Sequence, residues 1–240
     1  MTIQMPDTPN LSNMKAVIFD LDGTLVDSMP AMASLVVEGL KRLGIKISYE
    51  KFGKRLFGEF FGAPLPQGFR MIPTLMYRIG RIAGLGRLKA FLFSFEVSFQ
   101  LRKSYDSAEL FPDVIELLRT LQNRGISLAL VSMGSRKGIL KILDNTGIRE
   151  YFKVIVSRDE VKKQKPDPEG YLLVQRALKI TPEKIAVVGD MPIDILAAKQ
   201  AGMPSIAVTT GLAQEDWFQE PALPSLIVKS LFEIQELFQT

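Results

Sequence analysis

Short, almost purely apolar runs recur along the chain. Five have the length and side-chain content of strands buried on both faces, at residues 16–19, 127–131, 153–156, 185–188 and 205–208. Between the later runs, apolar residues follow helical spacing over 113–123, 136–146, 168–179 and 192–201. Alternating strands and helices predict a doubly wound, Rossmann-like α/β core with a mostly parallel sheet. Residues 226–238 (LIVKSLFEIQELF) add a last short strand and an amphipathic helix.

The interval between the predicted strands 16–19 and 127–131 departs from this alternation. The first two predicted strands are much further apart than the roughly 30 residues of a βαβ unit. Two apolar runs at helical spacing lie between them, separated by Gly-Leu-Gly. Their members are Ile72, Leu75, Met76, Ile79, Ile82 and Ala83, then Leu88, Phe91, Leu92, Phe95 and Phe99. We expect an all-helical cap over 29–105, inserted into a core of 14–28 and 106–240, with Phe91, Phe95 and Phe99 as core residues.

The composition limits which catalytic and metal-binding groups the protein can use. The 240 residues are 47% hydrophobic, enough to bury a sizeable core. The chain has no cysteine, which excludes disulfides and thiolate metal sites, and no histidine, which excludes imidazole bases and ligands. The N-terminus has no basic leader followed by an apolar block, and no apolar stretch reaches the roughly 20 residues that span a bilayer. We therefore expect a cytoplasmic protein that uses carboxylates, lysine, hydroxyls and a hard metal ion.

Positive charge is concentrated in the insertion. The net charge of the whole chain is +4, yet residues 51–103 hold ten Lys or Arg and two acidic residues. This favours a cap that meets anions, with some of Arg70, Arg78, Arg81 and Arg87 recruiting an anionic substrate. Solvated arginines, or a membrane-surface helix that binds anionic lipid, are the alternatives. We expect no nucleic-acid partner, and the oligomeric state cannot be read from the sequence.

Polar residues follow the predicted strands directly. Asp20 and Asp22 end the first, Ser132 ends the second, and Asp190 with Asp194 follow the fourth. Ligands of α/β sheets gather at the carboxyl ends of strands, so these side chains predict one site. Two adjacent carboxylates at a poorly solvated strand end need a cation or a shared proton. Asp20 and Asp190 can share Mg²⁺ with a nearby backbone carbonyl and waters.

Four segments in this order resemble the haloacid dehalogenase superfamily, in particular its phosphoglycolate phosphatase-like members with a cap after the first motif. They are DLDGTLVDS from Asp20, VSMGS around Ser132, KPDP from Lys165, and GDMPIDILAAKQAG around Asp190. The resemblance covers about 14–28 and 107–210 and is weak over 50–105. It implies a Mg²⁺-dependent phosphatase that acts on a small phosphorylated metabolite, such as phosphoglycolate or a sugar phosphate, through an aspartyl-phosphate.

The resemblance also implies roles for single residues. Asp20 would be the nucleophile, Asp22 the general acid and base, and Lys165 the cation that neutralises nucleophile and phosphoryl group. The expected metal-binding residues are Asp20, Asp22 and Asp190. Asp194 would orient metal waters or the lysine, or simply cap its helix. The phosphate-binding residues would be Gly23, Thr24, Ser132, Met133, Gly134 and Lys165.

The chain departs from the family pattern at one point. A small hydroxyl residue often follows the fourth-motif aspartate, where this chain has Met191 and Pro192. We expect the loss of one hydrogen bond there and retention of the metal.

Other functions remain open at this point. A dehalogenase does not need the second acid, and nothing marks Lys51, Lys54 or Lys89 as the Schiff-base lysine of a phosphonatase. A sugar-phosphate mutase is the nearest enzymatic alternative, although its usual cap histidine is missing. An anion-binding module without turnover is the alternative from a different class, which the intact motifs disfavour.

Overall fold

The predicted strands form one parallel sheet. The computed structural model describes residues 11–47, 71–104, 108–211 and 213–239. The strands are β1 (Ala16–Phe19), β2 (Ser127–Val131), β3 (Phe152–Val156), β4 (Ile185–Gly189), β5 (Ser205–Val208) and β6 (Leu226–Val228). They lie in the order β3-β2-β1-β4-β5-β6, and every pair is parallel. The doubly wound α/β fold is therefore confirmed, and β1 lies at the centre between β2 and β4.

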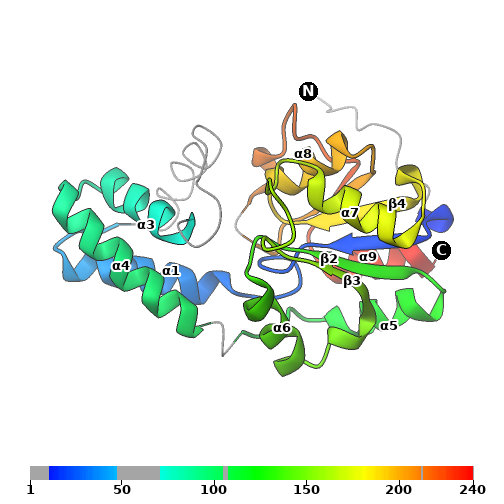
Figure 1. Ribbon diagram of the computed structural model, residues 1–240, viewed down its shortest axis with the longest axis horizontal. Coiled ribbons are helices and arrows are strands. Elements are labelled where there is room, and N and C mark those ends of the chain that lie inside the picture. Colours follow the sequence, from blue (N-terminus) through cyan, green and yellow to red (C-terminus); the bar gives the residue numbers. More distant parts are fainter. Residues whose placement is uncertain (1–10, 48–70, 105–107, 212, 240) are drawn as a thin grey trace. The chain divides into compact units, whose positions relative to one another are not determined.

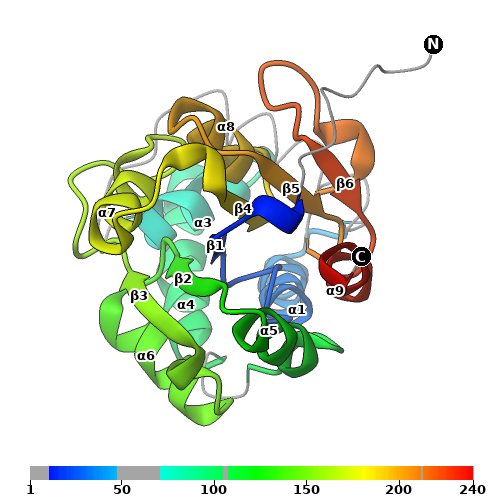
Figure 2. The same ribbon diagram turned by 90° about the vertical axis from the view of Figure 1, so that its right-hand side faces the viewer.

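Helices cover both faces of this sheet. They are α5 (Val114–Asn123), α6 (Arg136–Asn145), α7 (Glu169–Leu178), α8 (Pro192–Gln200) and α9 (Leu231–Gln239). Figure 2 shows α7 and α8 on one face and α5 with α9 on the other. Short 3-10 helices occur at Leu11–Asn13, Arg149–Tyr151, Pro182–Lys184 and Glu215–Trp217.

Successive side chains of a central strand point to opposite faces of the sheet, and both faces are buried under helices. Ala16 and Ile18 of β1 join the hydrophobic cluster under α7 and α8, together with residues of β2, β4 and both helices. Val17 and Phe19 point to the opposite face because successive side chains of a strand alternate, and they are equally buried. A strand covered on both faces therefore reads as an unbroken apolar run.

Contacts divide the chain into two units, residues 1–27 with 108–240 and residues 28–107. The described part of the second unit consists of α1 (Met29–Arg42), α3 (Met71–Ile82) and α4 (Arg87–Ser104). Figure 1 shows α4 running alongside α1 and α3, as their contacts require. None of the helices within the described ranges is long and apolar enough to cross a membrane.

The expectation that Phe91, Phe95 and Phe99 are core residues is wrong. These residues are 60%, 72% and 56% exposed. The buried face of α4 is instead made of Ala90, Phe93, Val97 and Leu101.

Two glycines explain why this face of α4 is the buried one. A Cβ on Gly39 of α1 would lie 2.9 Å from the Phe93 ring, and one on Gly80 of α3 would lie 3.2 Å from it. Because both positions lack a side chain, Phe93 can insert between the two helices. The apolar face opposite Phe93 is left exposed.

Candidate active site

The loop after β1 holds the first two carboxylates. The backbone N–H of Asp20 donates to the Val188 carbonyl at 2.9 Å, which continues the β1–β4 ladder and places Asp20 next to the end of β4. The chain then turns tightly, since Leu25 and Val26 both donate back to the Leu21 carbonyl. Gly23 has φ +83°, a left-handed conformation that glycine adopts without strain.

Asp190 directly follows β4 and is 2% exposed. Its Oδ1 accepts a hydrogen bond from the Thr24 hydroxyl at 3.3 Å. A Cβ on Gly23 would lie 2.7 Å from Asp190 Cγ, and one on Gly211 would lie 2.9 Å from Asp190 Cβ. The Thr210 hydroxyl donates to the Gly23 carbonyl at 2.7 Å, which ties the loops after β1 and β5 together. Asp190 is therefore held against backbone that only glycine permits.

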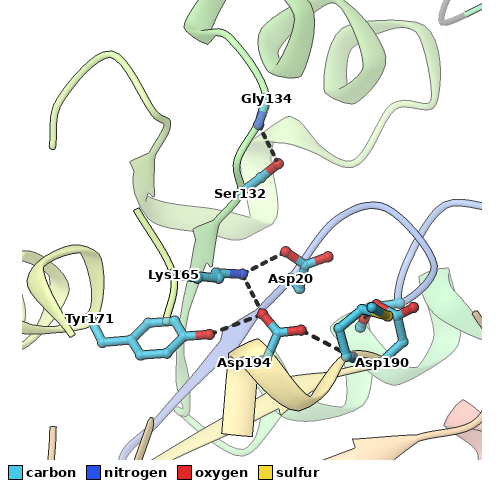
Figure 3. A network of polar contacts seen from close by, with 9 residues as sticks. Asp20, Ser132, Gly134, Lys165, Tyr171, Asp190 and Asp194 are labelled. Atoms are coloured by element: carbon cyan, nitrogen blue, oxygen red, sulfur yellow. Dashed lines mark hydrogen bonds and ion pairs between the residues drawn. The ribbon is translucent and has the colours of Figure 1, made fainter. Parts of the chain in front are cut away.

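Lys165 connects the carboxylate that follows β1 with a carboxylate in the first turn of α8. Its Nζ donates to Oδ1 of Asp20 and to Oδ1 of Asp194, each at 2.6 Å (Figure 3). All three side chains are buried. The other oxygen of Asp194 accepts the backbone N–H of Met191 at 3.1 Å. Asp194 thus caps the start of α8 and also contacts the lysine, so the capping contact does not exclude the predicted role beside Lys165.

Burial and charge act against each other in this group. Burial raises the pKa of Asp20 to about 7, because the attraction of Lys165 only partly offsets the loss of solvent. Burial lowers the pKa of Lys165, but the charges of Asp194 and Asp20 outweigh it and hold that pKa well above its usual range. Lys165 is therefore a permanent cation beside Asp20.

Ser132 follows β2 and is 5% exposed. Its backbone N–H donates to the Val156 carbonyl at 3.0 Å, and its Oγ accepts the backbone N–H of Gly134 at 3.1 Å. Ser132, Met133 and Lys165 line one cavity. The segment after β2 and the lysine thus line the same cavity, and their binding of phosphate stays a prediction.

The donor set available to a metal consists of oxygens. Asp20 and Asp190 end neighbouring strands, and Mg²⁺ typically takes one or two carboxylates and completes its shell with waters and substrate oxygens. No three acidic side chains of the described residues form a group that could hold a metal. Two carboxylates with other oxygens fit the ion, and a ligand role for Asp22 stays a prediction.

Two contributors were missed from the sequence. Tyr171 of α7 donates from its hydroxyl to Asp194 Oδ1 at 3.3 Å and is 1% exposed. Gly211 follows β5 and abuts Asp190. Gly211 could have been predicted as a site residue, because a glycine after a strand end allows close approach of backbone. Tyr171 could not, because an aromatic residue in an apolar helix pattern resembles any core residue. Among the cap arginines, Arg70 lies outside the described residues, and Arg81 donates to the Leu85 carbonyl at 2.8 Å.

Similar proteins identify the family of this chain. A sequence model of the haloacid dehalogenase-like hydrolase family matches residues 17–208. The phosphoglycolate phosphatase of Salmonella typhi is 34% identical over 210 residues, which are 84% of this chain and 83% of that protein. The four motifs therefore lie within a relationship that spans most of the chain.

Solved structures share the fold. A predicted phosphoglycolate phosphatase from Haemophilus somnus 129pt has a TM-score of 0.73 at 24% identity, covering 94% of this chain and 98% of that one. A Thermotoga maritima protein assigned as a beta-phosphoglucomutase has a TM-score of 0.67 at 27% identity, covering 94% and 97%. The chain belongs to the haloacid dehalogenase-like hydrolase family and is one of its phosphatases.

Proposed function

We propose that this protein is a Mg²⁺-dependent phosphatase that hydrolyses a small phosphorylated metabolite through a phosphorylated Asp20. The observation that carries the proposal is the 2.6 Å contact between the Lys165 ammonium and the Asp20 carboxylate, beside Asp190 at the end of the next strand. A buried carboxylate held by a fixed cation is suited to attack an anionic phosphoryl group, because the cation offsets the repulsion.

The reaction takes two displacements at phosphorus. In the first, an Asp20 oxygen bonds to phosphorus, the bond to the leaving oxygen breaks, and Asp22 gives that oxygen a proton. In the second, Asp22 takes a proton from water, the water oxygen bonds to phosphorus, and the bond to Asp20 breaks. Inorganic phosphate leaves and both carboxyl groups return to their starting states.

The remaining residues hold the phosphoryl group. We assign Ser132, with Met133 and the amide of Gly134, to its oxygens on one side, and Gly23 and Thr24 to the other. Lys165 stabilises the charge that develops on the equatorial oxygens. Asp20 and Asp190 would hold Mg²⁺, which supplies further charge neutralisation and alignment of the phosphate when bound.

The substrate class follows from the relatives and from charge. Phosphoglycolate is the first compound to test, because the Salmonella typhi relative is named for it. We propose that residues 29–105 act as the cap that selects the organic part of the substrate. The surplus of cations in that segment supports an anionic substrate.

A sugar-phosphate mutase is the second candidate, favoured by the likeness to the Thermotoga maritima protein. Transfer to a second hydroxyl instead of water would give an isomeric sugar phosphate and no free phosphate. The lack of any histidine disfavours it, because such mutases usually carry one in the cap. Product analysis with hexose phosphates separates the two reactions.

The test is phosphate release from an aryl phosphate and from a panel of phosphorylated metabolites, with Mg²⁺ or with EDTA. We expect release by the wild type in Mg²⁺, none in EDTA, and none by Asp20→Asn, which should still fold. Wild-type turnover by Asp20→Asn would remove Asp20 as the nucleophile. Full activity of Asp190→Ala with unchanged Mg²⁺ dependence would refute the metal site.

A further inference from the structure

Asp20, Lys165 and Asp194 form a network of charged side chains, in which the Asp194 carboxylate is held in place by backbone. Its Oδ2 accepts the Met191 amide at the start of α8, and its Oδ1 accepts Lys165. The carboxylate is therefore oriented by backbone on one side, while its other oxygen faces the lysine. Because Lys165 also donates to Asp20, the position of its ammonium depends on how strongly each carboxylate attracts it.

Tyr171 contacts both members of the Lys165–Asp194 pair. It lies in the first turn of α7, and its hydroxyl donates to the same Oδ1 of Asp194 that accepts Lys165 (Figure 3). Its ring centroid is 5.5 Å from Lys165 Nζ, within the range of a cation–π contact. The hydroxyl and the ring thus act on the carboxylate and on the ammonium respectively.

The shared oxygen sets up a competition. The Lys165 contact is 2.6 Å and the Tyr171 contact is 3.3 Å, so the lysine is the stronger partner and the tyrosine modulates it. Burial raises the pKa of Tyr171 well above its usual range, so the hydroxyl stays a neutral donor. Without that donor, the full charge of Asp194 Oδ1 would attract Lys165 and draw it from Asp20.

We propose that Tyr171 is a positioning residue that keeps the Lys165 ammonium shared between Asp194 and Asp20. This inference rests on the proposed function, because it assigns Tyr171 a part in presenting Lys165 to the nucleophile. Tyr171 does not contact Asp20 through any hydrogen bond found among the described residues. It acts through Asp194 and Lys165.

A merely structural role makes a different prediction. Tyr171 packs in the cluster formed by Val131, Val156, Val174 and their neighbours, and phenylalanine would fill the same space. If packing is its only role, Tyr171→Phe should behave as wild type. If the hydroxyl positions Lys165, Tyr171→Phe should lose turnover while the fold and substrate binding persist.

The experiment compares Tyr171→Phe with Tyr151→Phe, the same chemical change at a partly exposed tyrosine directly before the amino end of β3, whereas the site lies at the carboxyl ends of the strands. We expect Tyr171→Phe to lower kcat about tenfold with KM within about twofold, since one hydrogen bond to a charged group is lost. Tyr151→Phe should leave both unchanged. Wild-type kcat for Tyr171→Phe would overturn the inference.

A double-mutant cycle of Tyr171→Phe and Asp194→Asn tests whether Tyr171 acts through Asp194. Because Tyr171 is held to act through Asp194, Tyr171→Phe should have little further effect in an Asp194→Asn background. Fully additive losses in kcat would show that the tyrosine acts elsewhere, and the inference would be wrong.

A measurement without turnover separates this inference from the proposed function. The ε-ammonium resonance of Lys165 can be followed by ¹⁵N NMR in wild type and in Tyr171→Phe. A changed shift or faster proton exchange in Tyr171→Phe is the expected result, and an unchanged signal would refute the positioning role whether or not the protein hydrolyses phosphate. If instead Asp20→Asn remains active, the proposed function fails and the NMR result still decides on Tyr171.

Discussion

Asp20 is a carboxylate in an environment that disfavours its charge. It is 9% exposed, and its nearest cation, Lys165, is shared with Asp194. Burial therefore outweighs the ion pair and raises the pKa of Asp20 to about 7. A second cation at this point would stabilise the ionised form, which is the physical argument for Mg²⁺ beside Asp20 and Asp190.

This raised pKa predicts a pH-dependent stability in EDTA. Between the ordinary pKa of 3.8 and about 7, folded Asp20 keeps a proton that the unfolded chain has lost. The contribution of Asp20 is thus fully present below pH 3.8 and is lost as the pH rises to about 7. The difference in free energy of unfolding between wild type and Asp20→Asn should fall over this window and then level off. Chemical denaturation at several pH values measures it, and a rising difference would contradict the assignment.

Gly23 offers a test of how Asp190 is held. Gly23→Ala strains a positive-φ position and pushes a Cβ into the Asp190 carboxylate, whereas Gly147→Ala strains φ +70° with nothing within 4 Å. We expect Gly23→Ala to raise the Mg²⁺ concentration for half-maximal activity by about tenfold or more. Gly147→Ala should leave that concentration unchanged and only cost about 1 kcal/mol of stability. Equal metal dependence in both variants would show that the contact with Asp190 is unimportant.

At the level of elements, α4 shows why helix position and helix face are different problems. Its exposed apolar residues are Leu88, Phe91, Leu92, Phe95 and Phe99, and an equally apolar set is buried opposite them. Because apolar residues occur on both sides of α4, no single amphipathic stripe marks its inner side. The space beside Gly39 of α1 and Gly80 of α3 admits Phe93 and so favours burial of the face that carries it. Neither glycine belongs to α4, so the sequence of α4 alone does not indicate which face is buried.

The two faces of α4 predict losses of stability of very different size for the same substitution. Phe93→Ala removes a ring that is 1% exposed and should lower the free energy of unfolding of the helical unit by about 3–5 kcal/mol. Phe95→Ala, at 72% exposure, should change it by no more than about 0.5 kcal/mol. Urea denaturation followed by circular dichroism, with hydrogen exchange of the α4 amides, measures both. A large loss in Phe95→Ala would place that face in an interface.

The core was predictable because its signals are local. Strands buried on both faces are unbroken apolar runs, so β1, β2 and β4 agree with prediction within one residue. The carboxyl-end rule then gathers Asp20, Ser132 and Asp190 at one edge of the sheet. The contacts of Tyr171 with Asp194 and Lys165 depend on how α7, the loop before it and α8 come together. That information is tertiary and is absent from any short segment.

For the whole molecule, charge is distributed unevenly. Residues 51–103 hold ten basic and two acidic residues within a chain of net charge +4. Within this stretch, Arg87 and Lys89 are exposed on α4. A basic surface raises the local concentration of an anionic substrate, and salt screens this effect.

A charge reversal tests this effect. Arg87→Glu with Lys89→Glu should lower kcat/KM for a phosphorylated substrate about threefold at low salt, leave kcat unchanged, and flatten the salt dependence. Lys184→Glu, at an exposed position just before the amino end of β4, is the control and should have little effect. Equal losses from both changes would mean that overall net charge, and not the cap, attracts substrate.

The most direct test of the central claim is to trap the phosphorylated nucleophile. In Asp22→Asn the base that activates water is lost, and an aryl phosphate with an acidic phenol as its leaving group does not need the proton that Asp22 would have given. The aspartyl-phosphate should therefore accumulate when this aryl phosphate and Mg²⁺ are supplied. Mass spectrometry after an acid quench should then find one added phosphoryl group on the peptide that contains Asp20, and none in Asp20→Asn. Phosphate release by Asp20→Asn, or a phosphoryl group on any other residue, would contradict the account.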